Sequence, residues 1–208
     1  ADEGMVLLKN NGVLPLGGKT KKPTRVSLYG TGSYNFLSGG VGSGCVHTPY
    51  IIDLVQGLKN VGIEATADLT EIYKKYIDYA KLKFEADRSG YRWFEAPLMG
   101  DQKMPEIDIT QELLKKQLKQ SDMAVITISR QAGEGIDRKI DGEFNLTPQE
   151  MKMIQDVTAA YHAENKPVIV VINSGSVMET TSWSAYPDAI LLAWQPGEEG
   201  GNAVADIL

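Results

Sequence analysis

A carboxylate flanked by two glycines is the group in this chain best placed for chemistry. Glu134 lies between Gly133 and Gly135, shortly after the apolar run 123–128, which reads as a buried strand. Glycines here give up conformational entropy and side-chain packing, and in return the backbone can turn sharply and leave the glutamate clear of its neighbours. Ligands of open α/β sheets bind outside the carboxyl ends of strands. The residues alone leave two interpretations open: a reactive carboxyl, or a tight surface turn whose glutamate faces water.

A second candidate is the glycine-rich run 39–44, Gly-Gly-Val-Gly-Ser-Gly, which contains Ser43. It follows a predicted strand and precedes a predicted helix, as phosphate-binding loops do. It lacks the Gly-Lys-Ser/Thr ending of a P-loop, and no acidic ribose partner stands about 20 residues further on. The alternatives are a nucleotide- or phosphate-binding module, or a loop that must pass close to another surface and from which Ser43 can donate a hydrogen bond to a ligand.

Other reactive groups are sparse. The two histidines, His47 and His162, have no acidic partner at metal-ligand spacing and are read as structural. A Ser-His-Asp set cannot be assembled around them, and Ser174-Gly175-Ser176 lacks the Gly-x-Ser-x-Gly pattern of a nucleophile elbow. The single cysteine, Cys45, excludes an internal disulfide and any multi-cysteine metal site. We therefore expect no metal and no cofactor.

The elements that must position these groups alternate between apolar runs and amphipathic segments. Continuously apolar runs separated by helices are typical of a parallel sheet covered on both faces. The sequence predicts a three-layer α/β sandwich with a mostly parallel sheet of about five or six strands. Expected strands are 25–29, 61–65, 123–128, 167–173 and 189–194, and the run 5–9 is also apolar.

Helix starts are marked by capping residues. Thr147, Pro148 and Glu150 form a capping-box pattern with proline at the first helical position. Thr110 caps a helix over 111–120, and Thr48 with Pro49 predicts a helix that begins just after the glycine-rich loop. Further helices are expected over 72–84 and after the Glu198-Glu199 pair. Residues 88–109 show no period, and their aromatic residues either contact a ligand or pack this segment onto the domain: Tyr91, Trp93 and Phe94.

Composition bounds the class of protein. The chain has 208 residues, 42% of them hydrophobic, and a net charge of −6, which argues against a nucleic-acid partner. No run of 18 apolar residues is present, so no membrane span is expected. Both ends look cut, and we expect residues 1–208 to be one domain of a longer polypeptide. The cellular location stays open between the cytoplasm and export in a bacterium.

Five motifs in order resemble the second, α/β-sandwich domain of glycoside hydrolase family 3, which includes β-glucosidases and β-xylosidases. They are Glu3–Asn10 with Leu14-Pro15-Leu16, then Gly42-Ser43-Gly44, then Gly133–Arg138, then Asn173-Ser174-Gly175, then Trp194–Gly200 with Ala203–Leu208. The resemblance runs from end to end, and the nearest likeness is to bacterial β-glucosidases.

The resemblance implies a retaining, exo-acting enzyme that hydrolyses terminal, non-reducing β-linked sugars. Glu134 matches the family's acid/base glutamate, and Ser43 matches a serine that contacts the substrate. The nucleophile of the family is an aspartate on a separate (β/α)8 barrel, which these residues do not contain. The expected partners are thus a β-linked glycoside and the barrel of the same polypeptide, and residues 1–208 alone are expected to be inactive. Asp137 and Arg138 are expected to hold the loop by a local charge pair. The alternative functions are a phosphate-binding module and a non-catalytic structural domain.

Overall fold

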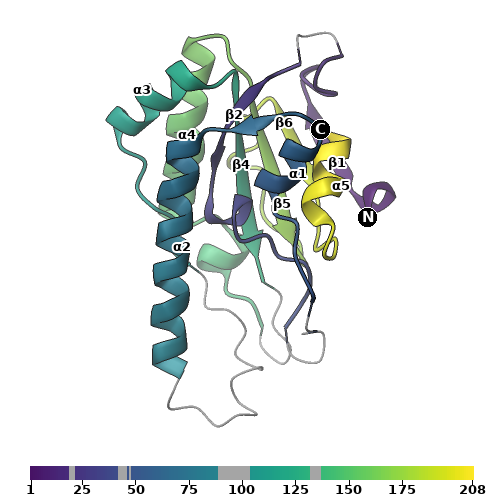
Figure 1. Cartoon of the computed structure of the whole chain (residues 1–208), viewed down its shortest axis with the longest axis vertical. Coiled ribbons are helices and arrows are strands. Elements are labelled where there is room, and N and C mark those ends of the chain that lie inside the picture. Colours follow the sequence, from purple (N-terminus) through teal and green to yellow (C-terminus); the bar gives the residue numbers. More distant parts are fainter. Residues whose placement is uncertain (19–21, 42–45, 47, 89–103, 132–136) are drawn as a thin grey trace.

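The computed structural model has one six-stranded sheet between two layers of helices (Figure 1). The structure describes residues 1–208 except 19–21, 42–45, 47, 89–103 and 132–136. The strand order is β1-β6-β5-β4-β2-β3. All neighbouring strands pair in parallel except β1, which pairs antiparallel with β6. The strands are β1 (Val6–Asn10), β2 (Arg25–Tyr29), β3 (Glu64–Ala65), β4 (Met123–Arg130), β5 (Val168–Ser174) and β6 (Ala189–Leu192).

Helices cover both faces of the sheet. Helices α1 (Leu54–Asn60) and α5 (Gly200–Ile207) pack against each other on one face. The other face carries α2 (Ala67–Arg88), α3 (Gln111–Gln120) and α4 (Pro148–Ala163), which pack on β2, β4 and β5. Short turns at Asp2–Gly4 (η1), Thr31–Ser33 (η2) and Ile140–Phe144 (η5) complete the described elements. The predicted three-layer sandwich and its mostly parallel sheet are confirmed.

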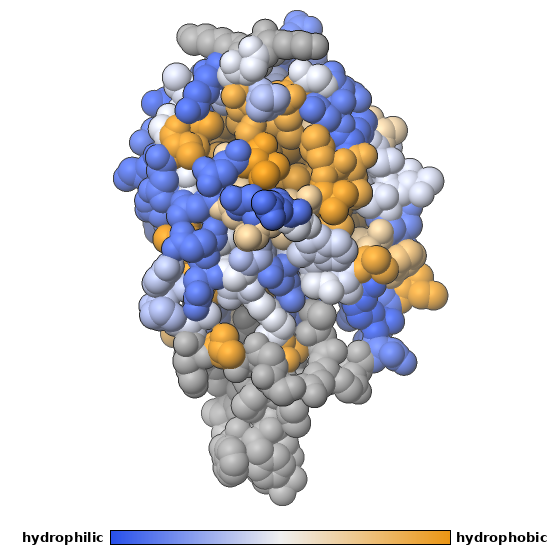
Figure 2. Space-filling view, turned by 90° about the vertical axis from the view of Figure 1, so that its right-hand side faces the viewer, coloured by the Kyte–Doolittle hydropathy of each residue, from blue (hydrophilic) through white to orange (hydrophobic). Residues whose placement is uncertain are grey.

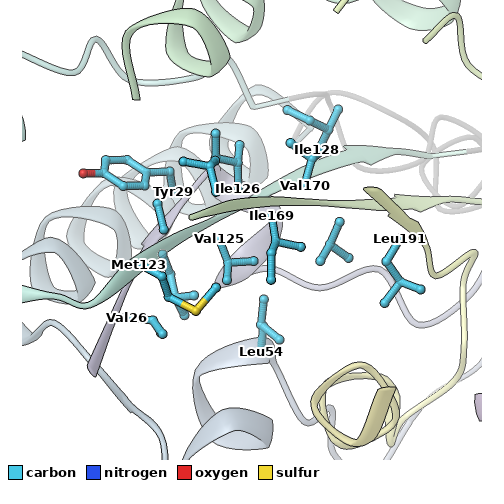
Figure 3. Close-up of a cluster of buried hydrophobic side chains, with 14 of the residues drawn as sticks. Val26, Tyr29, Leu54, Met123, Val125, Ile126, Ile128, Ile169, Val170 and Leu191 are labelled. Atoms are coloured by element: carbon cyan, nitrogen blue, oxygen red, sulfur yellow. The ribbon is translucent and has the colours of Figure 1, made fainter. Parts of the chain in front are cut away.

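The core lies on both sides of the central strands (Figure 3). Alternate residues of β4 point to opposite faces, so Val125 lies toward α1 while Ile126 lies on the α2–α4 side. Every residue of β5 is buried, as expected for a central strand of a sheet covered twice. This rigid centre fixes where the carboxyl ends of β2, β4, β5 and β6 emerge.

Two glycines allow α1 and α5 to touch along their backbones. A Cβ atom on Gly57 would lie 2.0 Å from the carbonyl oxygen of Gly201, and one on Gly201 would lie 2.0 Å from the carbonyl oxygen of Asp53. Any larger residue at either position would push the helices apart. The close contact fixes the segment after β6 against the segment that leads into α1.

Some predicted boundaries are confirmed and others are wrong. Thr110 caps α3 and the Thr147–Glu150 capping box opens α4, as predicted. The helix expected at Thr48 and Pro49 instead begins at Leu54, because Asp53 caps it by accepting a hydrogen bond from the amide of Gln56. The strand expected at 61–65 shortens to Glu64–Ala65. Over the described residues, no helix is long and apolar enough to cross a membrane.

Candidate active site

The two predicted site residues, Glu134 and Ser43, lie outside the described residues. The chain on either side of each is described, and it emerges at the carboxyl edge of the sheet. Gln131 directly follows the last residue of β4, and Gly39 lies in the segment that follows β2 and leads to Ser43. Tyr91, Trp93 and Phe94 also lie outside the described residues.

Asn173 is the centre of the hydrogen bonds at this edge. Its side chain is fully buried near the end of β5. Its amide oxygen accepts from the backbone N–H of Leu37 at 2.7 Å, and its amide nitrogen donates to the carbonyl of Leu37 at 2.9 Å and to that of Trp194 at 2.7 Å. Ser129 on β4 also donates to it at 3.3 Å. One amide therefore ties the segments after β2 and β6 to the two central strands.

Gln131 forms a second link further out. Its side-chain nitrogen donates to the carbonyl of Gly39 at 3.3 Å, and its side-chain oxygen accepts from Gln195 at 2.8 Å. The backbone N–H of Gly197 donates to the carbonyl of Ser38 at 2.9 Å. The segments that lead into Ser43 and into Glu134 are thus joined to each other and to the segment after β6.

A buried ion pair holds the other side of the Glu134 segment. Arg130, 3% exposed, donates two hydrogen bonds of 2.7 Å to the carboxylate of Glu150, which is 2% exposed. The remaining guanidinium N–H groups donate to the carbonyls of Ser129, Glu143 and Asn145. All five donors of the arginine are satisfied, which is what makes a buried guanidinium tolerable. Glu150 also accepts from the backbone and hydroxyl of Thr147, so one carboxylate both caps α4 and pairs with β4.

Arg138 contributes in a different way from the one expected. Its guanidinium donates to the carbonyls of Glu143 and Val177. Asp137 is exposed, and the ion pairs of the described residues do not include one between it and Arg138. The predicted charge pair is therefore wrong in this respect: the arginine holds the segment through backbone carbonyls, which the sequence does not reveal.

Glu106 adds a titratable group next to this edge. Its carboxylate accepts from the backbone and hydroxyl of Thr31, just after β2, at 2.9 and 2.8 Å. Burial raises the pKa of Glu106 to about 7 from an ordinary 4.5. The Thr31 hydrogen bonds and the charge of Arg130 oppose this rise, while the charge of Glu150 adds to it. Arg130 is already paired with Glu150, so its charge only partly offsets the cost of ionising the partly buried Glu106.

The described geometry argues against phosphate binding at the start of α1. Helix α1 begins eleven residues after Ser43, and its N-terminus is capped by the carboxylate of Asp53, which would repel a phosphate. Among the described residues, no group of three His, Cys, Asp or Glu side chains could hold a metal ion. His162 contacts Asp188 at 2.8 Å at the opposite end of β5 from the candidate site.

Three residues that organise this edge had no role assigned from sequence: Gln131, Asn173 and Glu106. The first two lie within motifs noticed for their neighbours, and their partners are distant in sequence. Glu106 lies in the segment without a period. Asn173 and Arg130 could have been noticed as polar residues at the ends of long apolar strands. A polar side chain that is buried there requires a hydrogen-bond partner.

The sheet, its two helical layers and the linked segments at its carboxyl edge define an α/β-sandwich domain with a candidate site at the strand ends. A sequence model described as the glycosyl hydrolase family 3 C-terminal domain matches residues 5–208. The chain belongs to this family.

Relatives among curated proteins include β-glucosidases. The chain is 37% identical over 235 residues to beta-glucosidase A of Butyrivibrio fibrisolvens, an alignment that covers 100% of this chain and 26% of that protein. It is 28% identical over 209 residues to a beta-glucosidase of Ruminococcus albus, covering 99% of this chain and 20% of the relative.

Solved structures give the same picture. Beta-glucosidase 3B from Thermotoga neapolitana, in complex with alpha-D-glucose, matches with a TM-score of 0.85 and 38% identity, covering 100% of this chain and 27% of that one. A beta-glucosidase from Paenibacillus barengoltzii matches with a TM-score of 0.80 and 30% identity, over 99% of this chain and 21% of the other. The chain thus spans about a quarter of the length of these relatives.

Proposed function

We propose that residues 1–208 form the C-terminal domain of a longer, retaining and exo-acting β-glycosidase, with β-glucosides as the substrate class. The observation that carries the proposal is the match at 38% identity, over the whole chain, to a beta-glucosidase whose structure contains glucose. Its support from the structure is the linked framework at the carboxyl edge of the sheet, where the loops that carry Glu134 and Ser43 begin.

Glu134 is the general acid and base of the proposed reaction. As an acid it gives its proton to the glycosidic oxygen as the bond to the anomeric carbon breaks and an aspartate of the barrel forms a glycosyl ester. As a carboxylate it then takes a proton from water, which attacks the same carbon and releases the sugar with its configuration retained. The two carboxyl groups would lie about 5 Å apart, the separation expected for retention. Ser43 donates a hydrogen bond to the bound sugar.

The test is Glu134→Ala in the longer polypeptide, assayed with a nitrophenyl β-glucoside. This substrate has a good leaving group, so cleavage needs little acid help and the glycosyl ester accumulates when the base is missing. We expect kcat to fall by about 10²–10⁴ and added azide to restore turnover with formation of a β-glucosyl azide, because azide needs no general base.

Two controls separate the alternatives. Residues 1–208 alone are expected to show no turnover, since the nucleophile lies in the barrel. If Glu134→Ala keeps the activity of the unmodified polypeptide, the domain is structural and the acid/base proposal is wrong. If residues 1–208 hydrolyse the glucoside and Glu134→Gln has no effect, the assignment fails altogether.

A further inference from the structure

Gln131 lies where two loops of the proposed site begin. Gly39 precedes Ser43 by four residues, and Gln131 precedes Glu134 by three. The side chain of Gln131 spans the gap between them: its nitrogen donates to the carbonyl of Gly39 at 3.3 Å, while its oxygen accepts from Gln195 at 2.8 Å. One amide therefore sets the spacing of three chain segments that come from β2, β4 and β6.

The layer beneath this amide is rigid. Asn173, fully buried, binds both backbone groups of Leu37 and the carbonyl of Trp194. These contacts hold the segment after β2 two residues before Gly39, and the segment after β6 one residue before Gln195. Asn173 also accepts from Ser129, so this layer reaches β4 two residues before Gln131. Beyond the end of β4, the side chain of Gln131 makes the next described link between the chain that leads to Glu134 and the segments after β2 and β6.

The other side of that loop is fixed independently. Arg130 and Arg138 donate to the carbonyl of Glu143, and Arg130 pairs with Glu150 at the start of α4. The described chain after Glu134 is therefore held by contacts that do not involve Gln131. We expect the loss of the Gln131 amide to leave the fold intact and to loosen the link between the described starts of the two loops.

We propose that Gln131 is a positioning residue that sets the distance between the acid/base loop and the substrate-contacting loop. This inference rests on the proposed function and goes beyond it, because it assigns a role in the reaction to a residue that does not touch the substrate. Reaction rates respond steeply to such placement, and a shift of about 1 Å can cost about a hundredfold in rate.

The test replaces Gln131 by methionine, which has nearly the same length and no hydrogen-bonding amide, in the longer polypeptide. Two substrates are compared: a nitrophenyl β-glucoside and an unactivated β-linked glucose disaccharide. The poor leaving group of the disaccharide needs its proton from Glu134, whereas nitrophenolate leaves largely without it. We expect kcat to fall about tenfold or more for the disaccharide and clearly less for the nitrophenyl glucoside, with the melting temperature little changed.

Matched variants complete the design. Gln155→Met removes an exposed amide that donates to Tyr186 at 2.9 Å on the outer surface of α4, and it should leave both rates unchanged. Gln195→Met removes the donor to Gln131 and should reproduce part of the effect, and combining it with Gln131→Met should add little. If Gln131→Met does not fold, Gln195→Met carries the test by the same ratio of the two substrates.

The outcomes distinguish this inference from the function on which it rests. If Glu134→Ala is severely impaired but Gln131→Met behaves as Gln155→Met does, the positioning role is wrong and the proposed function stands. Equal losses on both substrates, together with a lower melting temperature, would also overturn the role, since they indicate a merely structural contact. If Glu134→Ala is fully active, the proposed function itself has failed.

Discussion

At the scale of single residues, two carboxylates at the carboxyl edge of the sheet lie near the charge of one arginine. Arg130 supplies one positive charge, and the carboxylates of Glu150 and Glu106 are both close enough to respond to it. Glu150 accepts two hydrogen bonds from Arg130, whereas Glu106 accepts hydrogen bonds from Thr31 and is stabilised to a smaller extent by the charge of Arg130. The charge of Glu106 also helps to raise the pKa values of Tyr73 and Tyr76, for which burial is the larger cause.

The raised pKa of Glu106 makes the stability of the fold depend on pH. In the unfolded chain the carboxyl loses its proton near its ordinary pKa of 4.5, while in the folded protein it keeps the proton up to about 7. Between these values the folded state binds more protons, so the free energy of unfolding falls as pH rises through this window. The total loss is up to about 3 kcal/mol.

Glu106→Gln should remove this part of the pH dependence. The amide oxygen can still accept one hydrogen bond from Thr31, and no charge develops above pH 7. We expect the variant to be more stable than the unmodified chain at pH 8 and to lose that advantage at pH 4, as measured by urea unfolding at each pH. Glu112→Gln, an exposed carboxyl in the first turn of α3, is the control. Parallel pH curves for all three proteins would contradict the prediction.

At the scale of elements, the sequence predicts helix starts well where a nearby side chain accepts the hydrogen bonds of the first backbone N–H groups. The caps at Thr110 and Thr147 act within one turn of helix, and both helices start where the sequence indicated. The start of α1 was missed because two capping signals compete. Residues before Asp53 are drawn into backbone hydrogen bonds with the segment after β6, from Ile52 to Glu198 and from Gly201 to Ile52. Such pairing over about 150 residues leaves no local trace.

The candidate site was likewise predictable from the sequence only in part. Its location at the strand ends follows from the apolar runs, and the identity of Glu134 as a proposed acid/base follows from family resemblance. The framework was not predictable, because Gln131, Asn173 and Glu106 find their partners only when separate strands meet. A polar residue at the end of a buried strand indicates that a partner exists, but not which one.

The junction of β4 and α4 makes a second prediction at this scale. Glu150→Ala would leave the guanidinium of Arg130 buried without its carboxylate, which typically costs about 3–5 kcal/mol. Thr147→Ala removes only the cap of α4, at about 1 kcal/mol, and Thr110→Ala on α3 is a cap of the same type away from the ion pair. In chemical unfolding, the free energy of unfolding of Glu150→Ala should be clearly lower than that of the other two variants. If it is no more destabilising than Thr147→Ala, the pair does not fasten β4 to α4.

At the scale of the whole molecule, the two edges of the sheet differ. Strand β3 lies beside α1, whereas β1 pairs only with β6 and leaves its outer edge free among the described residues. Three consecutive side chains of β1 are large, apolar and about half exposed: Val6, Leu7 and Leu8 at 43%, 46% and 49%. Figure 2 shows hydrophobic residues gathered on the upper part of the side of the molecule on which β1 lies. An exposed apolar edge strand is a template for pairing with another chain.

We therefore expect residues 1–208, prepared alone, to self-associate through β1 as concentration rises. A charge on an edge strand opposes such pairing, because a lysine cannot be buried between two chains without loss of its hydration. Leu8→Lys should shift the particle mass toward the monomer in light scattering or sedimentation. Leu82→Lys is the control, since Leu82 is 67% exposed on α2, away from any strand edge. If both changes act equally, general solubility explains the effect; if neither acts, β1 is not a contact surface between copies of the isolated chain.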